Sequence, residues 1–224
     1  MIKTITKEHQ GYQLLNKYNY VPEILDALIR VSEFSRDKFY EPKACMISFA
    51  FTETFIQTNS EKNTTYRAKP KNEISILVDR LNKWFQRTNP ESRKHQQNTF
   101  KFHFLWVKEA KLIRSTSSEW KALTKEEQAR NPKYLYPHYH MMCFYDGKKA
   151  TAKAFDAFML HLEKEGKLRS GGCKVSRENG LKGLEALSKC LNTRYNDFMK
   201  HASYLAKEET KKGNKLSWDK SILR

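Results

Sequence analysis

The sequence predicts an α+β protein with a ferredoxin-like antiparallel sheet in βαββαβ order, helices on one face of that sheet, and an additional N-terminal helix. Segments with the period of a helix alternate with apolar, β-branched and aromatic runs in the order α, then β-α-β-β-α-β-α. Hydrophobic residues make up 39% of the 224 residues and aromatic residues 12%. This is enough material for a core, and more than a disordered basic chain carries.

The first expected elements are a helix over residues 22–38 and a strand over residues 44–55. Pro22 suits the first turn of a helix. Apolar residues then recur at helical spacing, at Ile24, Leu28 and Val31. The second segment, ACMISFAFTETF, is apolar, β-branched and aromatic, which is typical of a central strand. Residues 60–70 are polar and are expected to form a loop.

The middle of the chain predicts a helix followed by two strands. Residues 72–87 carry an apolar stripe at helical spacing. Residues 99–110 and 135–145 are rich in aromatic and apolar side chains, as strands are, and an Asp-Gly pair supplies turn chemistry after the second. The polar stretch 114–133 between the two strands is expected to be an excursion with a helical patch.

The last third of the chain predicts a helix, a short strand and a final helix. Residues 151–165 have an inward apolar face, and Gly166 ends this helix. Glycines flank residues 172–176, a short strand candidate. Residues 195–211 complete the pattern as a helix.

The predicted organisation is a main domain over residues 41–212, between an N-terminal helical extension (1–40) and a basic C-terminal tail (213–224). The sequence contains no repeat, low-complexity tract or Pro/Gly/Ser-rich linker. No apolar run approaches the roughly 20 residues that cross a bilayer, and residues 1–10 lack the apolar stretch of a signal peptide. We therefore expect a cytoplasmic protein with no membrane partner.

The charge of the chain predicts a polyanionic partner. There are 42 Lys and Arg residues against 25 Asp and Glu residues, a formal net charge of +17. Each phosphate that Lys or Arg neutralises releases condensed counterions, which favours nucleic acid. The basic residues are spread along the chain rather than gathered in one block, which favours a face or groove assembled by the fold. A ribosome-associated or merely solubilising surface is the plainer interpretation of the same charge.

The sharpest local feature is the sequence His138-Tyr139-His140. Side chains at i and i+2 of a strand project from the same face, so both imidazoles would point one way from a rigid platform. Two neutral imidazoles at this spacing can hold a divalent metal. With seven histidines in the chain, the pair also fits a chance occurrence, and on its own it is only suggestive.

Glu109 is the candidate third ligand. It lies at the end of the strand expected to neighbour the histidine strand, and a carboxylate with two imidazoles suits Mg²⁺ or Mn²⁺ with positions left open for a phosphate. The alternative is a surface carboxylate between Lys108 and Lys111. His103 lies six positions before Glu109 and shares its face of the strand. The two interpretations are a residue that supports the metal ligands and, as we favour, a histidine at the edge of the core.

The candidate nucleophile is Tyr204, with Lys207 three residues later. On a helix, positions i and i+3 share a face, so the phenol and the ammonium can approach one phosphate together. Tyr-x-x-Lys recurs in this lysine-rich chain, but only this copy lies on an expected helix. The other copies are Tyr40/Lys43, Tyr66/Lys69 and Tyr145/Lys148. A role in aromatic packing is the alternative for Tyr204.

Several other classes are excluded by the motifs that are missing. There is no P-loop, no Gly-x-Ser-x-Gly, no His-Glu-x-x-His and no dinucleotide-binding fingerprint in the sequence. The four cysteines are widely separated, without Cys-x-x-Cys, which argues against a zinc knuckle or a disulfide framework. They are Cys45, Cys143, Cys173 and Cys190.

Three short segments that contain the candidate site residues follow one another along the chain: LWVKE at 105–109, PHYH at 137–140 and SYLAK at 203–207. In this order the chain resembles the replication-initiation proteins of filamentous phages and related prophages, the inovirus gene 2-type family. That family is itself similar to the HUH endonucleases of rolling-circle replication. The resemblance covers roughly residues 20–210, and the ordered triple is more specific than any of its parts.

The resemblance implies a βαββαβ core, a divalent metal (Mg²⁺ or Mn²⁺) on two histidines and often an acidic residue, and a helix-borne tyrosine that attacks DNA. Carried onto this chain, His138 and His140 match the histidine pair, and Tyr204 matches the nucleophile. Lys207 then matches its partner, and Glu109 the acidic ligand, although a long excursion follows it.

The activity that the resemblance implies is site-specific nicking and rejoining of single-stranded or origin DNA, to initiate rolling-circle replication of a phage, prophage or plasmid. Attack by Tyr204 would leave a 3′-OH primer and a 5′-phosphotyrosine on the protein. Some HUH replicases use two tyrosines, but Tyr195 lies nine residues from Tyr204, so we expect a single-tyrosine enzyme. The implied partners are a separate helicase and host replication proteins.

Two alternatives remain open at the level of sequence. A ferredoxin-like nucleic-acid-binding module without chemistry would share the charge and the fold, yet would not need His138, His140 or Tyr204. Its binding to nucleic acid would persist in EDTA, whereas nicking by a nuclease would stop. A relaxase or tyrosine transposase of the same superfamily differs in DNA context, which these residues do not distinguish.

Overall fold

The structure is a computed structural model, and the statements below concern the residues that it describes. These are residues 7–15, 18–52, 55, 73–88, 102–112, 124–126, 135–169, 174–175, 191–207 and 218–221. The loop predicted over 60–70 and most of the excursion predicted over 114–133 lie outside them.

The described elements are helices and strands interspersed along the chain. The helices are α1 (Pro22–Lys38), α3 (Glu73–Thr88), α7 (Ala152–Lys164), α9 (Tyr195–Ala202) and a 3-10 helix, η1 (Ser203–Ala206). The strands of the main sheet are β3 (Pro42–Phe49), β4 (Phe102–Leu112), β5 (Leu135–Asp146), β6 (Lys174–Val175) and β7 (Trp218–Lys220). Strands β1 (Glu8–His9) and β2 (Tyr12–Gln13) form a separate small hairpin.

The main sheet has the strand order β6-β3-β5-β4-β7, and every pairing in it is antiparallel. The two long central strands, β4 and β5, pair over their whole length, from Phe102 opposite Tyr145 to Leu112 opposite Leu135. β3 pairs with the other side of β5. Strand β5 is therefore flanked on both edges.

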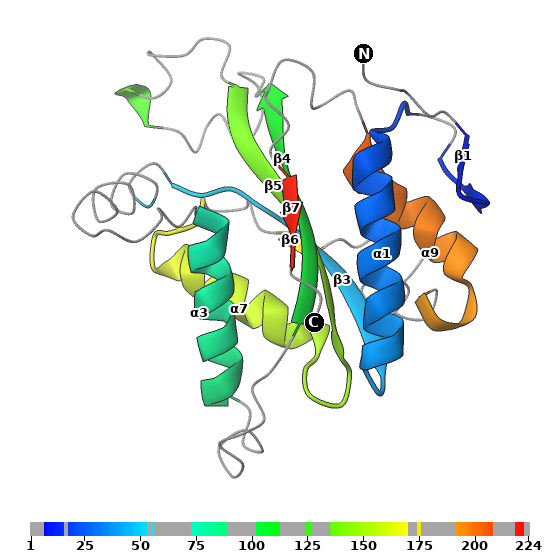
Figure 1. The fold of residues 1–224 in the computed structure, drawn as a ribbon. Helices are drawn as coiled ribbons and strands as arrows, with labels where there is room; N and C mark the ends of the chain where they lie inside the picture. Colours follow the sequence, from blue (N-terminus) through cyan, green and yellow to red (C-terminus); the bar gives the residue numbers. More distant parts are fainter. Residues whose placement is uncertain are drawn as a thin grey trace, which may run out of the picture.

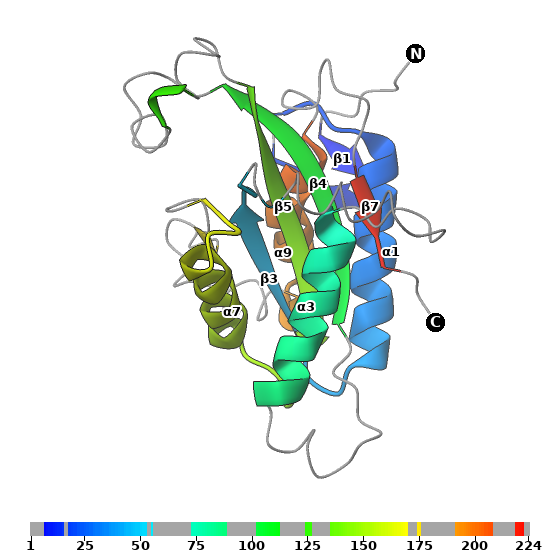
Figure 2. The ribbon, with the colours of Figure 1, turned by 90° about the vertical axis from the view of Figure 1, so that its left-hand side faces the viewer.

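Helices cover both faces of this sheet, which is seen between them in Figure 1. Helices α1 and α9 pack on one face, and α3 and α7 pack on the other, which is turned toward the viewer in Figure 2. The first face is lined by Ala44, Met46, Leu105, Val107, Met142 and Phe144. The second is lined by Cys45, Ile47, Phe49, Trp106, Met141 and Cys143.

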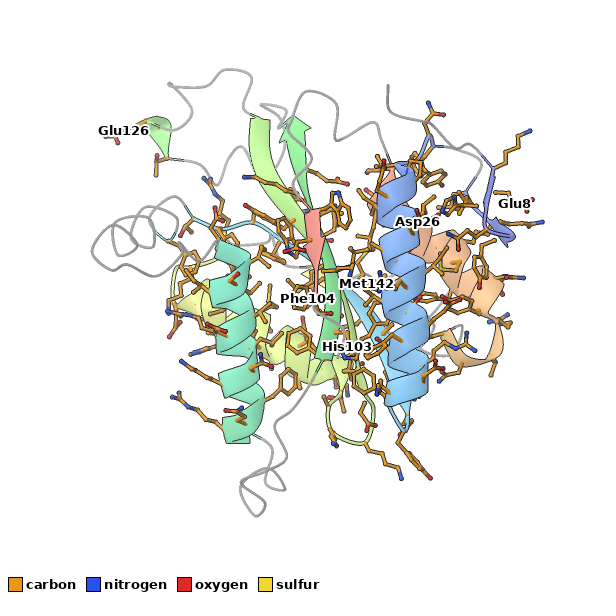
Figure 3. The ribbon with its side chains drawn as sticks, in the orientation of Figure 1. Glu8, Asp26, His103, Phe104, Glu126 and Met142 are labelled. Atoms are coloured by element: carbon orange, nitrogen blue, oxygen red, sulfur yellow. The ribbon has the colours of Figure 1, made fainter. Side chains whose placement is uncertain are left out.

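The two faces follow from the pleat, because successive side chains of a strand point to opposite sides. On β4, His103 lies on the α1 side and Phe104 on the α3 side, and Met142 of β5 joins His103 on the α1 side (Figure 3). The aromatic residues at even positions of β4 therefore build the core between the sheet and α3–α7.

An α+β protein with an antiparallel sheet is confirmed, but the expectation of helices on one face is wrong. That expectation holds for α3 and α7, whereas α1 and α9 cover the opposite face. The physical reason lies in β5, where Met141 to Tyr145 form an unbroken apolar run that is buried on both sides. Such a run needs cover on both faces of the sheet.

Most predicted boundaries agree closely with the structure. Pro22 occupies the first turn of α1, and Thr151 caps α7 by accepting a hydrogen bond from the backbone N–H of Ala154. The strand predicted over 44–55 instead starts at Pro42 and ends at Phe49. Beyond it the chain bonds to the segment that follows α7, where the N–H of Thr52 donates to the carbonyl oxygen of Lys167 over 3.0 Å.

The final helix is shorter than predicted. The helix expected over 195–211 is α-helical only to Ala202 and then tightens into the 3-10 turn η1. The backbone N–H of Val21 donates to the carbonyl oxygen of Ala206 over 2.9 Å, and Tyr20 forms a β-bridge with Lys207. These bonds engage the backbone groups that a longer α-helix would use internally.

The C-terminal segment predicted as a basic tail contains β7, which pairs with the outer edge of β4. In the part of the chain that the structure describes, none of the helices combines the length and the apolar character needed to cross a membrane.

Candidate active site

The histidine pair lies on β5, on the sheet face that α1 and α9 cover. His138 and His140 lie on one face, as the pleat requires of residues i and i+2, and their rings meet edge to face with centroids 4.6 Å apart. His140 lies opposite Ser48 of β3 and Val107 of β4 in the register of the sheet. Its Nδ1 is 2.7 Å from Ser48 Oγ, which orients the ring.

Glu109 joins the pair from the neighbouring strand. It lies directly opposite His138 in the antiparallel register of β4 and β5, so both side chains share one face. Its Oε2 is 3.3 Å from Nε2 of His140. Glu109 and His140 are only 4% and 7% exposed, so their interaction is shielded from water and is stronger than a surface contact.

Tyr204 and Lys207 come from the 3-10 turn after α9. With three residues per turn, positions i and i+3 stack almost directly, closer than on an α-helix. Lys207 Nζ donates a hydrogen bond of 2.5 Å to Tyr204 Oη and lies 3.8 Å from the centre of the Tyr204 ring. The lysine is 7% exposed.

The tyrosine–lysine pair contacts the histidines and the carboxylate of the site at Glu109 and His140. Lys207 Nζ is 3.7 Å from Glu109 Oε2, and the Tyr204 ring lies edge-on to His140 with centroids 5.5 Å apart. All the site residues named from the sequence thus lie in one cluster, although they come from three separate segments of the chain.

Two residues of the cluster were missed by the sequence reasoning. Ser48, which contacts His140, is the one polar residue in the apolar run of β3, and that isolation was a usable signal. Tyr18 packs edge-on against Tyr204, with ring centroids 5.9 Å apart. Nothing in the sequence links these two tyrosines, because their contact depends on the backbone pairing of Tyr20 with Lys207.

The other candidates lie elsewhere. His103, six positions before Glu109 on β4, is about 20 Å away along the strand. Its Nδ1 is 2.8 Å from Ser35 Oγ, and its ring stacks on Phe39, so it is a histidine at the edge of the core, as we favoured. The Tyr195 hydroxyl is 2.5 Å from the hydroxyl of Ser32 on α1.

Glu109, His138 and His140 are the side chains of the cluster that could ligate a divalent metal. Within the described residues, no group of three or more His, Cys, Asp and Glu side chains is arranged as a ready-made metal site. Two potential donor atoms, Glu109 Oε2 and His140 Nε2, are 3.3 Å apart. Adjacent ligands of one octahedral ion, each about 2.1 Å from it, are separated by about 3 Å.

The spacing of the Glu109 and His140 donor atoms is thus compatible with two adjacent ligands of a divalent cation. A carboxylate oxygen favours hard ions such as Mg²⁺ and Mn²⁺, and imidazole nitrogen favours first-row transition metals, so Mn²⁺ satisfies both. For His140 Nε2 to bind a metal, Nδ1 must carry the proton and donate it to Ser48 Oγ, which the observed contact permits. The His138 ring adjoins His140 as the third candidate ligand.

The cluster thus combines a phenol bonded to an ammonium with a buried carboxylate–imidazole pair. A phenol beside an ammonium has the chemistry of a nucleophile whose developing charge is stabilised, and a carboxylate–imidazole pair has the chemistry of cation ligands. In comparisons with protein-family models, curated proteins and solved structures, no significant match to this chain is found.

Proposed function

We propose that this protein is a metal-dependent endonuclease and strand transferase of the HUH type. It nicks and rejoins single-stranded DNA at a specific site through a 5′-phosphotyrosine on Tyr204, and it initiates rolling-circle replication of a phage, prophage or plasmid. The observation that carries the proposal is the unbroken series of contacts from Tyr204 Oη through Lys207 and Glu109 to His140. The net charge of +17 supports DNA as the substrate.

The proposed reaction uses the phenol of Tyr204 as the nucleophile and the ammonium of Lys207 as its partner. Tyr204 Oη attacks the scissile phosphorus, a P–O bond to tyrosine forms, and the P–O3′ bond breaks. The phenolic proton is lost to water, and the leaving 3′ oxygen takes up a proton. Lys207 stays beside the attacking oxygen, where its charge stabilises the developing phenolate and the phosphoryl oxygens.

Glu109, His138 and His140 are the residues that would hold the divalent metal. When bound, Mg²⁺ or Mn²⁺ supplies Lewis-acid polarisation of the phosphate. Ser48 keeps the His140 ring in the orientation in which Nε2 faces Glu109. The aryl phosphate ester retains much of the energy of the broken bond, so the reverse step can rejoin strands without a nucleotide cofactor.

We also propose the ferredoxin-like assignment for the core β3-α3-β4-β5-α7-β6. Its support is the strand order β6-β3-β5-β4, in which β5 lies between β3 and β4, the two strands that α3 connects. This insertion is the split βαβ arrangement. The proposal places the enzyme in the cytoplasm, with a separate helicase and host replication proteins as partners.

The test is covalent capture of DNA. The protein is incubated with a labelled pool of random single-stranded DNA and Mn²⁺, and SDS-stable adducts are counted after electrophoresis. The wild type is expected to form an adduct, and Tyr204→Phe is expected to form none while binding DNA nearly as well. Tyr195→Phe is the matched control on the same helical segment, and it should retain the adduct.

Two results would contradict the proposal. An adduct that survives in Tyr204→Phe would assign the nucleophile elsewhere. The absence of any adduct in the wild type, together with DNA binding that persists in EDTA, would identify a nucleic-acid-binding module without chemistry.

A further inference from the structure

One carboxylate oxygen of the site lies close to two basic side chains at once. Glu109 Oε2 lies 3.3 Å from Nε2 of His140 and 3.7 Å from Nζ of Lys207. Both Glu109 and Lys207 are buried, at 4% and 7% exposure. A buried carboxylate requires a compensating charge, because removing an ion from water is costly. In the metal-free protein that compensation includes the Lys207 ammonium.

From this shared oxygen we infer that Lys207 is an internal counter-ion that competes with the divalent metal for Glu109. The inference rests on the proposed metal role of Glu109 and His140. A cation between Oε2 and Nε2 would share the carboxylate with Lys207 and repel its ammonium at short range. Metal binding and the Glu109–Lys207 ion pair therefore oppose each other.

The surroundings of Lys207 determine where the ammonium goes when a metal arrives. Its backbone is held by the bridge to Tyr20. Its Nζ already donates to Tyr204 Oη and lies over the Tyr204 ring, with the Tyr18 ring 5.8 Å away. Aromatic faces attract an ammonium. The released charge therefore stays at the phenol, so occupation of the metal site directs Lys207 to the nucleophile.

The competition has a consequence that can be measured without any DNA. Removing the ammonium should tighten metal binding, because it removes both a rival for Glu109 and a repulsive charge. Even with the weak interaction of charges in bulk water, a single and a double charge about 5 Å apart repel enough to change affinity by roughly tenfold. Lys207→Met is thus expected to bind Mn²⁺ at least about tenfold more tightly than the wild type.

The experiment is isothermal titration calorimetry of the full chain with MnCl₂. Lys207→Arg keeps the charge and is expected to stay near the wild-type affinity. Lys200→Met is the matched control, because Lys200 is an exposed lysine of α9. His138→Ala and Glu109→Gln identify the heat that belongs to this site. Far-UV circular dichroism checks folding, and Lys207→Gln replaces Lys207→Met if the latter does not fold.

The outcomes separate this inference from the proposed function. One outcome overturns the competition and leaves the endonuclease proposal standing. In it, His138→Ala abolishes the Mn²⁺ binding seen in the wild type, but the uncharged Lys207 variant binds Mn²⁺ no more tightly than the wild type. If His138→Ala and Glu109→Gln both bind Mn²⁺ as the wild type does, the metal is not held at this site, and both proposals are overturned. The competition is supported if Lys207→Met binds Mn²⁺ more tightly than the wild type while Lys207→Arg and Lys200→Met do not.

Discussion

At the scale of single residues, the orientation of one imidazole depends on one hydroxyl. Ser48 Oγ is 2.7 Å from Nδ1 of His140, and Nε2 of the same ring faces Glu109. Partners of this kind fix the tautomer of a ligating histidine and the angle of its ring. Ser48 therefore belongs to the site although it would not touch a metal or a phosphate.

Ser48→Ala is expected to weaken Mn²⁺ binding by roughly tenfold or more, the usual cost of removing such a partner. The loss is expected because the freed imidazole can adopt the tautomer whose Nε2 carries the proton. Calorimetry with MnCl₂ measures it, and Ser48→Thr, which keeps the hydroxyl, should restore most of the affinity.

The chain offers a matched control for this variant. Ser35 Oγ contacts Nδ1 of His103 over 2.8 Å, the same kind of pair at a distance from the site. Ser35→Ala should leave the Mn²⁺ affinity unchanged. Equal losses in Ser35→Ala and Ser48→Ala would mean that the effect is general destabilisation and not the orientation of His140.

At the scale of elements, the N-terminal segment before α1 holds the turn that carries the nucleophile. Tyr20 bridges to Lys207, and the N–H of Val21 donates to the carbonyl oxygen of Ala206. Tyr18 then packs edge-on against Tyr204. The position of the phenol is therefore set partly by residues that precede it by almost the whole chain.

Tyr18→Ala is expected to slow adduct formation by roughly tenfold, because a loosely held nucleophile spends less time in line with the phosphate. Tyr18→Phe keeps the ring and should stay close to the wild-type rate. Single-turnover rates on the DNA substrate that the wild type captures measure the difference. Tyr40→Ala, at a tyrosine that is 79% exposed, is the control.

A different ordering of these rates would change the role of Tyr18. If Tyr18→Phe were as slow as Tyr18→Ala, the hydroxyl and not the ring would matter. Equal rates in Tyr18→Ala and the wild type would show that the backbone bonds of Tyr20 and Val21 suffice to position the turn.

The elements near the site show which features a sequence can predict. The spacing of His138 and His140 and the pairing with Glu109 depend on the pleat and on neighbouring strands, which the pattern of residues indicates. The end of α9 at Ala202 could not be predicted. It depends on backbone partners from residues 20 and 21, and the local pattern continues to favour a helix.

At the scale of the whole molecule, the sheet separates two core layers. Strand β5 contributes to both, and its apolar run was the available signal that helices cover both faces. The strand order could be anticipated from the βαββαβ sequence of elements. The sequence could not indicate which core layer α1 and α9 would join, since an amphipathic helix fits either face equally well.

Each core layer also contains a tyrosine whose ionisation opposes folding at high pH. Tyr139 lies in the layer under α3 and α7, and Tyr195 packs against the layer under α1. Burial raises the pKa of both phenols above the ordinary value of 10.0, and for Tyr139 the nearby Glu73 carboxylate adds to the rise. The folded protein therefore keeps both protons at a pH where the unfolded chain releases them.

The sign of the pH dependence follows from these raised pKa values. Stability from Tyr139 is fully present below its ordinary pKa of 10.0 and is lost as the pH rises beyond it toward the folded pKa. In that range one such group lowers the free energy of unfolding by up to about 1.4 kcal/mol per pH unit.

Tyr139→Phe keeps the ring and removes the ionisable proton. The free energy of unfolding of this variant should therefore fall less steeply with pH in the alkaline range, by about this amount. Urea unfolding between about pH 10 and pH 11 measures the slope, and Tyr40→Phe is the control. A slope in Tyr139→Phe equal to that of the wild type would show that this phenol ionises alike in the folded and unfolded chains.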